Sequence, residues 1–149
     1  YQEAIKYLDQ ALEIDPNNKF LLTGKGNVLR NLGNYEEAIE WFDKALEIDP
    51  KHVNALNNKG SALDELGKYA EAIEWYDKAL KIEPDHVNAL FNKGASRFNL
   101  GRYGEAIEWY DKALKIDPKY ALAKNNKHLA QEKLGKKKGG NIFTKLINE

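Results

Sequence analysis

Residues 69–84 read YAEAIEWYDKALKIEP, and nearly the same stretch occurs at three other places in the chain. The copies are YQEAIKYLDQALEIDP at 1–16, YEEAIEWFDKALEIDP at 35–50 and YGEAIEWYDKALKIDP at 103–118, so the four stretches start at equal intervals. A fixed period of this size predicts a stacked array, in which each unit buries its apolar face against its neighbours. Such arrays present extended surfaces, which favours binding over chemistry.

Each repeat is predicted to be a pair of helices, as residues 53–86 illustrate. Apolar residues at helical spacing predict a first helix from Val53 to Leu66, and Gly67 suits the left-handed residue that closes it. A second helix is expected from about Tyr69 onward. Pro84 has no backbone N–H and therefore ends the unit.

These spaced residues resemble the tetratricopeptide repeat family. The matching positions of the middle repeat are Leu56, Gly60, Leu63, Ala72, Tyr76, Ala79 and Pro84. The neighbouring repeats supply Leu22, Gly26, Leu29, Ala38, Phe42, Ala45 and Pro50, and Leu90, Gly94, Ala106, Tyr110, Ala113 and Pro118. The resemblance implies an all-α, right-handed superhelical array of antiparallel helix pairs. First helices would line its concave face, and the function would be non-catalytic protein binding.

The repeat frame predicts the organisation of the whole chain. It gives a second helix of a truncated repeat at 1–18, repeats at 19–52, 53–86 and 87–120, a capping helix at 121–138, and a linker with a short amphipathic tail at 139–149. Because the chain starts in mid-repeat and lacks methionine, we expect a piece of a longer array. That array could be an accessory region of a larger enzyme.

Four lysines depart from the family pattern, since Lys25, Lys59, Lys93 and Lys127 stand where the family has leucine. We expect their stems to lie along apolar surface with the ammonium groups in water.

Composition narrows the function classes. With 31% charged and 42% hydrophobic residues and no long apolar run, the chain is expected to be a globular domain without a membrane span. It has no cysteine, which excludes disulfides and fits a reducing, cytoplasmic location. Residues 1–86 have ten basic and seventeen acidic side chains, whereas residues 87–149 have thirteen and six. This asymmetry either reflects solvated helix faces or favours weak head-to-tail contacts.

The resemblance places a set of polar and aromatic residues on the concave groove: Asn27, Asn54, Asn58, Asn88, Phe91, Asn92, Phe98 and Asn126. Asn58, Asn92 and Asn126 recur at the repeat period and would stack as a ladder. Their amides offer a donor and an acceptor that match a peptide backbone. Alternatively, they satisfy nearby backbone groups of the array itself.

Phe91 and Phe98 give a second candidate signal in the groove. An exposed aromatic side chain is often an anchor for a partner, but these two could instead pack on the neighbouring cap helix. Trp41, Trp75 and Trp109 also recur at the repeat period. For them, core or inter-repeat packing and a convex binding stripe are the two alternatives.

A chaperone-tail partner is disfavoured. In family members that clamp a terminal carboxylate, the equivalent places include three cations. Here those places hold Thr23, Asn27, Asn58, Asn88 and Asn92, none of which is a cation.

The chain ends suggest an alternative function, which is structural self-assembly. Ile5, Leu8 and Leu12 would be partly bare because their partner helix is missing. The tail adds an apolar face of Ile142, Phe143 and Leu146, which is too short to be stable alone and must dock or stay disordered. Head-to-tail association could join these two regions.

Other classes have little support. The three histidines lack catalytic or metal-binding spacing, and there is no phosphate-binding loop, so we expect neither an enzyme nor a metal or cofactor site. The lysine cluster at 133–138 could contact phosphate, but it also fits a helix C-terminus, which makes nucleic acid an unfavoured partner.

Overall fold

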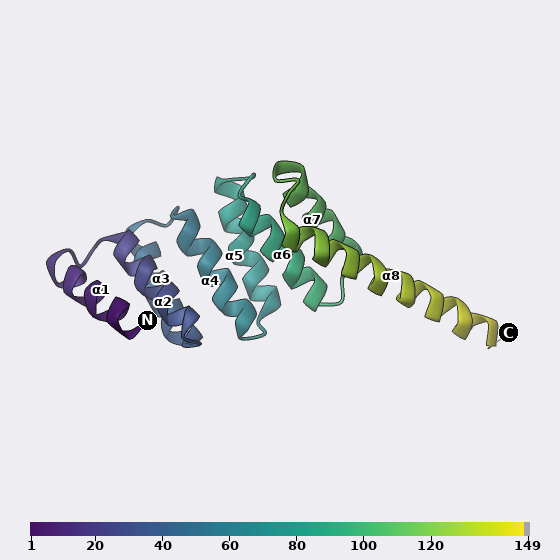
Figure 1. Cartoon of the computed structure of the whole chain (residues 1–149), viewed down its shortest axis with the longest axis horizontal. Helices are drawn as coiled ribbons and strands as arrows, with labels where there is room; N and C mark the ends of the chain where they lie inside the picture. The colour runs from purple at the N-terminus through teal and green to yellow at the C-terminus, as the bar shows by residue number, and fades with distance from the viewer. Residues whose placement is uncertain (148–149) are drawn as a thin grey trace. The chain divides into compact units, whose positions relative to one another are not determined.

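A computed structural model describes the backbone of residues 1–147 and the side chains of residues 1–140 (Figure 1). The described part consists of helices and contains no strand: α1 (Gln2–Ile14), α2 (Lys19–Asn31), α3 (Tyr35–Ile48), α4 (Val53–Glu65), α5 (Tyr69–Ile82), α6 (Val87–Asn99), α7 (Tyr103–Ile116) and α8 (Ala121–Ile147). The predicted all-α fold is confirmed, and each predicted repeat contains its two helices.

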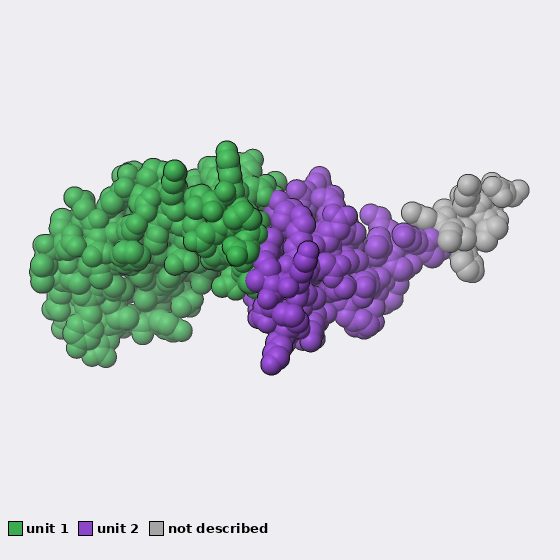
Figure 2. Space-filling view, turned by 90° about the horizontal axis from the view of Figure 1, so that it is seen from above, with its two compact units in different colours: residues 1–89 green, residues 90–149 purple. Residues whose placement is uncertain are grey.

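The helices form two compact units (Figure 2). Unit 1 is Tyr1–Ala89 and holds α1 to α5 with the first turn of α6. Unit 2 is Leu90–Glu149 and holds the rest of α6 together with α7 and α8.

Glycine in a left-handed conformation ends α4, as the sequence predicts. Gly67 has a φ of 74°, and its N–H donates to the carbonyl oxygen of Asp64 at 2.9 Å. The N–H of Lys68 reaches back to the carbonyl of Leu63 at 2.9 Å, which completes the Schellman pattern. Gly33 and Gly101 repeat this conformation, so the same turn joins the two helices of every full repeat.

A second glycine position lets the paired helices approach closely. A Cβ atom placed on Gly60 would lie 2.5 Å from the ring of Tyr76, which is fully buried. The equivalent distances are 2.5 Å for Gly26 to Phe42 and 2.8 Å for Gly94 to Tyr110. An aromatic ring therefore packs directly on the first helix in all three repeats.

Each unit has its own core. In unit 1, α2 to α5 bury a continuous run of small and large apolar residues that includes Leu22, Phe42, Leu56 and Tyr76. Trp41 and Trp75 pack against these clusters while half-buried, which confirms packing as a role of both. In unit 2, the buried residues Ala106, Tyr110 and Ala130 form the centre of a cluster lined by partly buried aromatics.

Helix α1 is packed on one side only. Ile5, Leu8 and Leu12 are half-buried, whereas Phe42 and Leu46, which stand at the places of Leu8 and Leu12 in the next repeat, are buried. No residue of α1 is fully buried. The partly bare face predicted for this helix is therefore present.

The C-terminal region differs from the predicted linker. Helix α8 continues through Gly139 and Gly140 to Ile147 instead of breaking there. Glycine inside a helix costs about 1 kcal/mol relative to alanine but keeps its N–H, so it does not by itself end a helix. The predicted docking of Ile142, Phe143 and Leu146 lies outside the described side chains. Among the described residues, no helix is long and apolar enough to cross a bilayer.

Candidate functional site

The candidate binding residues of unit 1 lie on α2 and α4. The Nδ2 group of Asn58 donates to Oδ1 of Asn27 at 2.8 Å and so joins the two helices. The Oδ1 atom of Asn58 accepts from Nδ2 of Asn57 at 3.3 Å. An asparagine amide has two N–H donors and two lone pairs. These two bonds use one of the two N–H donors and one of the two lone pairs of the half-buried Asn58 amide.

We call Asn27, Asn54, Asn57 and Asn58 the amide face of unit 1. Asn54 is exposed at the start of α4, Asn27 is half-buried and Asn57 is buried. The structure thus brings Asn27 and Asn58 together, although sequence reasoning had not paired them. Asn88, on the first turn of α6, is exposed.

A side-chain hydrogen bond joins α4 and α5 within unit 1. The Tyr76 hydroxyl on α5 donates to Oδ2 of Asp64 on α4 at 2.6 Å. Burial raises the pKa of Tyr76 far above its usual value, and the nearby Asp64 carboxylate raises it further. Burial also leaves the Tyr76 side chain without access to solvent, so Asp64 takes the place of water as its acceptor.

The equivalent place in unit 2 is apolar. Phe98 stands at the repeat position of Asp64, and Ala95 stands at that of Ser61, whose side chain also interacts with the Tyr76 hydroxyl. The hydroxyl of Tyr110 is consequently buried without a hydrogen bond. Burial raises the pKa of Tyr110 to about 12, and the Asn126 side chain acts weakly in the opposite direction. Asn126 therefore lies near this hydroxyl.

We call Phe91, Asn92, Phe98 and Asn126 the aromatic face of unit 2. The ring centroid of Phe91 lies 5.7 Å from that of Tyr110 and 5.1 Å from that of Tyr120. Phe98 lies 5.1 Å from Tyr103. Both phenylalanines are half-buried and pack against the cluster that contains Ala130 of α8. They combine packing with a remaining exposed surface.

The asparagines of the predicted ladder are divided between the two units. Asn92 and Asn126 are half-buried in unit 2, as Asn58 is in unit 1. The stacking of the three along one groove stays a prediction.

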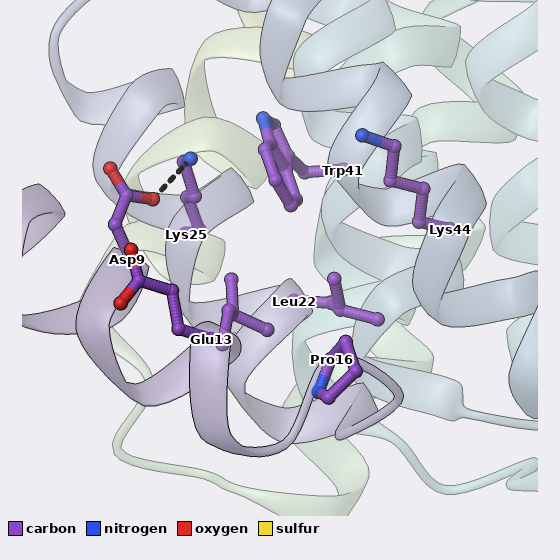
Figure 3. Close-up of a pocket in the computed structure, with 8 residues that line it drawn as sticks. Asp9, Glu13, Pro16, Leu22, Lys25, Trp41 and Lys44 are labelled. Carbon is purple, nitrogen blue, oxygen red and sulfur yellow. Dashed lines mark hydrogen bonds and ion pairs between the residues drawn. The ribbon is translucent and has the colours of Figure 1, made fainter.

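A recurring stack of lysine and tryptophan was missed by sequence reasoning. The Nζ atoms of Lys25 and Lys44 lie 3.8 and 3.9 Å from the ring centroid of Trp41, one on each side (Figure 3). Lys25 also pairs with Asp9 at 2.5 Å. The stack recurs with Lys59, Lys78 and Trp75, where Lys59 pairs with Asp43, and with Lys93, Lys112 and Trp109.

The expectation that the ammonium group lies in water is therefore wrong for Lys25, Lys59 and Lys93. The Lys25 side chain is only 11% exposed, and its charge is met by a carboxylate and by the negative face of an indole ring. The signal was available in the sequence. Asp9 precedes Lys25 by the same interval that separates Lys25 from Trp41, and this spacing recurs in the next repeat.

The histidines do not form a site in the described part of the chain. His52 is buried against the ring of Phe20, at a centroid distance of 5.4 Å, and its Nε2 atom has no hydrogen-bond partner. His86 accepts the backbone N–H of Ala89 and caps α6. No group of three potential metal ligands occurs among the described residues.

Comparisons with solved structures identify similar folds. The first TPR domain of human RPAP3 is 29% identical, with a TM-score of 0.80, and the match covers 83% of this chain and 98% of that one. The first TPR of Spaghetti (RPAP3), bound to the HSP90 peptide SRMEEVD, is 29% identical, with a TM-score of 0.76 over 78% and 93% of the chains. MamA is 27% identical, with a TM-score of 0.78 over 88% and 77%. No curated protein matches the chain.

Family models agree with the repeats described above. Three tetratricopeptide repeat models match residues 1–18, 20–85 and 57–121. Together they cover most of the chain. The chain therefore belongs to the tetratricopeptide repeat family.

Proposed function

We propose that this chain is a non-catalytic protein-interaction scaffold that binds a peptide or a helix along its first helices. The family membership supports a protein or peptide partner, as does the similar RPAP3 domain that is bound to a peptide. The binding residues proposed are the amide face of unit 1 with Asn88, and the aromatic face of unit 2.

The observation that carries this proposal is the pairing of unused amide capacity with half-buried aromatics. Asn58 retains one donor and one acceptor after its bonds to Asn27 and Asn57. Those groups suit a peptide backbone and do not read its side chains. Phe91 and Phe98 are held by ring contacts and need little ordering when a partner binds. We therefore expect the aromatic face to select an apolar side chain.

A terminal carboxylate is not the expected ligand at this surface. In carboxylate-clamping relatives the five equivalent places include three cations, whereas here they hold Thr23, Asn27, Asn58, Asn88 and Asn92, none of which is a cation. A neutral backbone contact fits these side chains better than a charged one does.

A random-peptide display selection tests the proposal. The wild-type chain should enrich peptides with an apolar residue, and the triple variant Asn58→Ala, Asn92→Ala, Asn126→Ala should lose the enrichment. Phe91→Ala with Phe98→Ala should retain backbone contact but lose the apolar preference. Asn34→Ala is a matched control, because this exposed asparagine makes no side-chain cap. No enrichment with the wild type, or equal enrichment with the triple variant, would contradict the proposal.

The half-bare face of α1 favours a second candidate function, which is self-assembly. Ile5, Leu8 and Leu12 would bind another copy, and Ile142, Phe143 and Leu146 would supply the partner surface. Sedimentation equilibrium at several concentrations and salt levels tests this idea. A mass that rises with concentration supports it, and a constant monomer mass at high concentration contradicts it.

A further inference from the structure

Unit 1 has a basic pocket that none of the amide-face residues lines. It is formed by the loop between α3 and α4, one residue of α4 and the last turns of α5. The pocket has a volume of about 450 Å³ and is lined by Pro50, Lys51, Leu56, Lys78, Lys81 and Ile82.

The lining combines three cations with an apolar floor. Leu56 is 2% exposed and Ile82 is 39% exposed. Lys51 and Lys81 make no ion pair with the described residues, and Lys78 lies over the ring of Trp75 at 3.7 Å. No carboxylate lines the pocket. Three ammonium groups around an apolar surface favour an anionic ligand that also has an apolar part.

The preceding repeat has the corresponding pocket, with a different charge. That pocket, of about 560 Å³, is lined by Pro16, Leu22 and Lys44 at the places of Pro50, Leu56 and Lys78, but also by Asp9 and Glu13 (Figure 3).

Two lysines of the basic pocket have no basic counterpart in the preceding repeat. Asp9 and Glu13 do have acidic counterparts in the middle repeat, Asp43 and Glu47, but these do not line the basic pocket. Asn17 stands where the basic pocket has Lys51, and Glu47 stands where it has Lys81. The basic pocket is thus a property of the middle repeat and not of the repeat frame.

The helix dipole explains the presence of only some of the pocket lysines. A lysine in the last turn of a helix interacts favourably with the helix dipole, which accounts for Lys81 in α5 and equally for Lys115 in α7. It does not account for Lys51, which lies in a loop, or for the absence of a carboxylate facing the three cations. Residues 1–86 have seventeen acidic and ten basic side chains, so this pocket is a local exception in an acidic region.

We propose that this pocket is a second interaction site, which binds an acidic segment of a partner protein. An apolar side chain of that segment would lie on Leu56 and Ile82, and flanking carboxylates would pair with Lys51 and Lys81. Recognition here requires charge, whereas the amide and aromatic faces are proposed to read backbone and apolar groups. The three lysines of the pocket come from the helix-connecting loop and the second helix α5, and none of them belongs to the amide face or the aromatic face.

Two-dimensional NMR of the full chain tests the site with a defined probe. The probe is a pentapeptide with one central leucine between two pairs of glutamates, acetylated and amidated so that no terminal charge contributes. We expect amide shift changes centred on Lys51, Leu56 and Lys81 that weaken with added salt. A peptide with glutamines in place of the four glutamates should give none.

Variants then separate this site from general charge attraction. Lys51→Gln with Lys81→Gln should weaken probe binding about fivefold or more, since two partly exposed ion pairs are lost. Lys51→Asn with Lys81→Glu installs the residues of the preceding repeat and should abolish binding. Lys115→Gln is the matched control, a C-terminal-turn lysine outside the pocket, and should leave binding unchanged.

Three outcomes would overturn the site: no shifts at the pocket, equal shifts with the glutamine peptide, or unchanged binding in the double variants. The Asn58, Asn92 and Asn126 alanine variant should still bind the probe, which keeps failure of this site distinguishable from failure of the proposed function.

Discussion

Tyr76 in unit 1 and Tyr110 in unit 2 occupy the same repeat position and are both fully buried, but their hydroxyl groups differ in hydrogen bonding. Tyr76 donates to Asp64, whereas Tyr110 has no hydrogen bond because Phe98 stands at the equivalent place. The rings pack alike on Gly60 and Gly94. The comparison teaches that the glycines, alanines and aromatic rings of the repeat frame are shared by both units. A few variable positions make unit 1 polar and unit 2 aromatic, since Phe91 and Phe98 replace Asn57 and Asp64.

Substituting the glycines that lie against the aromatic rings should have the largest effect on stability, and it should do so in both units. Gly60→Ala would place a methyl group 2.5 Å from the Tyr76 ring, and Gly94→Ala would place one 2.8 Å from the Tyr110 ring. We expect each to cost up to about 3 kcal/mol of unfolding free energy, because these rings cannot move within a packed core. Urea unfolding followed by circular dichroism measures this.

Gly104→Ala is the control for that experiment, since a Cβ there meets nothing within 4 Å. It should be neutral or slightly stabilising, because alanine is the better helix former. If Gly60→Ala unfolds at the same urea concentration as the wild type, the close approach of the helices is not needed for stability.

Removing Asp64, the hydrogen-bond acceptor of Tyr76 in unit 1, should have the next largest effect on stability. Asp64→Ala leaves the Tyr76 hydroxyl buried without this acceptor, which should cost about 1 to 2 kcal/mol. Adding Tyr76→Phe in the same chain should recover much of that loss, because the hydroxyl that lost its Asp64 acceptor is then gone. A double-mutant cycle from urea unfolding gives the coupling energy. Additive losses would show that the bond contributes nothing.

Removing the hydroxyl groups of Tyr76 and Tyr110 in separate variants tests whether the two groups contribute differently to stability. Tyr110→Phe removes a group that has no hydrogen bond, so we expect stability to stay the same or to rise by about 1 kcal/mol. Tyr76→Phe removes a bonded group and should lower stability by about 1 kcal/mol. Thermal melts of the two variants provide the measurement. Equal losses in both would mean that Tyr110 has a partner of its own in solution.

The smallest effect concerns His52 of unit 1. Burial, followed by the charge of Lys19, lowers the pKa of this histidine, although Asp49 opposes the shift. The unfolded state therefore binds a proton at a higher pH than the folded state. The stability contribution of neutral His52 is complete above a pH of about 6.5 and is lost as the pH falls through the lowered folded value.

His52→Gln should therefore reduce the loss of stability between about pH 7 and pH 5. Melting temperatures of the wild type and the variant across this range provide the test. A wild type that loses no more stability than the variant on acidification would contradict the lowered pKa.

Much of the fold follows from the sequence because repetition supplies several copies of the same evidence. Gly67 and Pro84 mark helix ends in one repeat, and their equivalents mark the same points in the others. The end of the array lacks this support. Without further copies to compare, Gly139 and Gly140 suggested a break, whereas backbone hydrogen bonding continues through them in α8.

Less of the site could be predicted, because its contacts join residues that the helical pattern does not relate. Asn27 and Asn58 are far apart in the sequence and meet only when α2 and α4 pack. The stack of Lys25 on Trp41 depends likewise on how helices pair. The constant spacing of Asp9, Lys25 and Trp41 is visible in the sequence. Helical periodicity and surface charge already explain each residue separately, so the spacing alone did not indicate a contact.

The central claim is that variable positions set the binding chemistry while the shared frame holds the fold, and Phe98→Asp tests it at one of these positions. This change gives unit 2 the residue that unit 1 has at Asp64. The measurement is a peptide-display selection on this variant and on the wild type, with melting temperatures recorded for both. We predict a melting temperature that is equal or higher, since Tyr110 gains an acceptor, and enriched peptides that no longer contain the apolar residue. Enrichment of the same apolar peptides by a folded variant would contradict the claim.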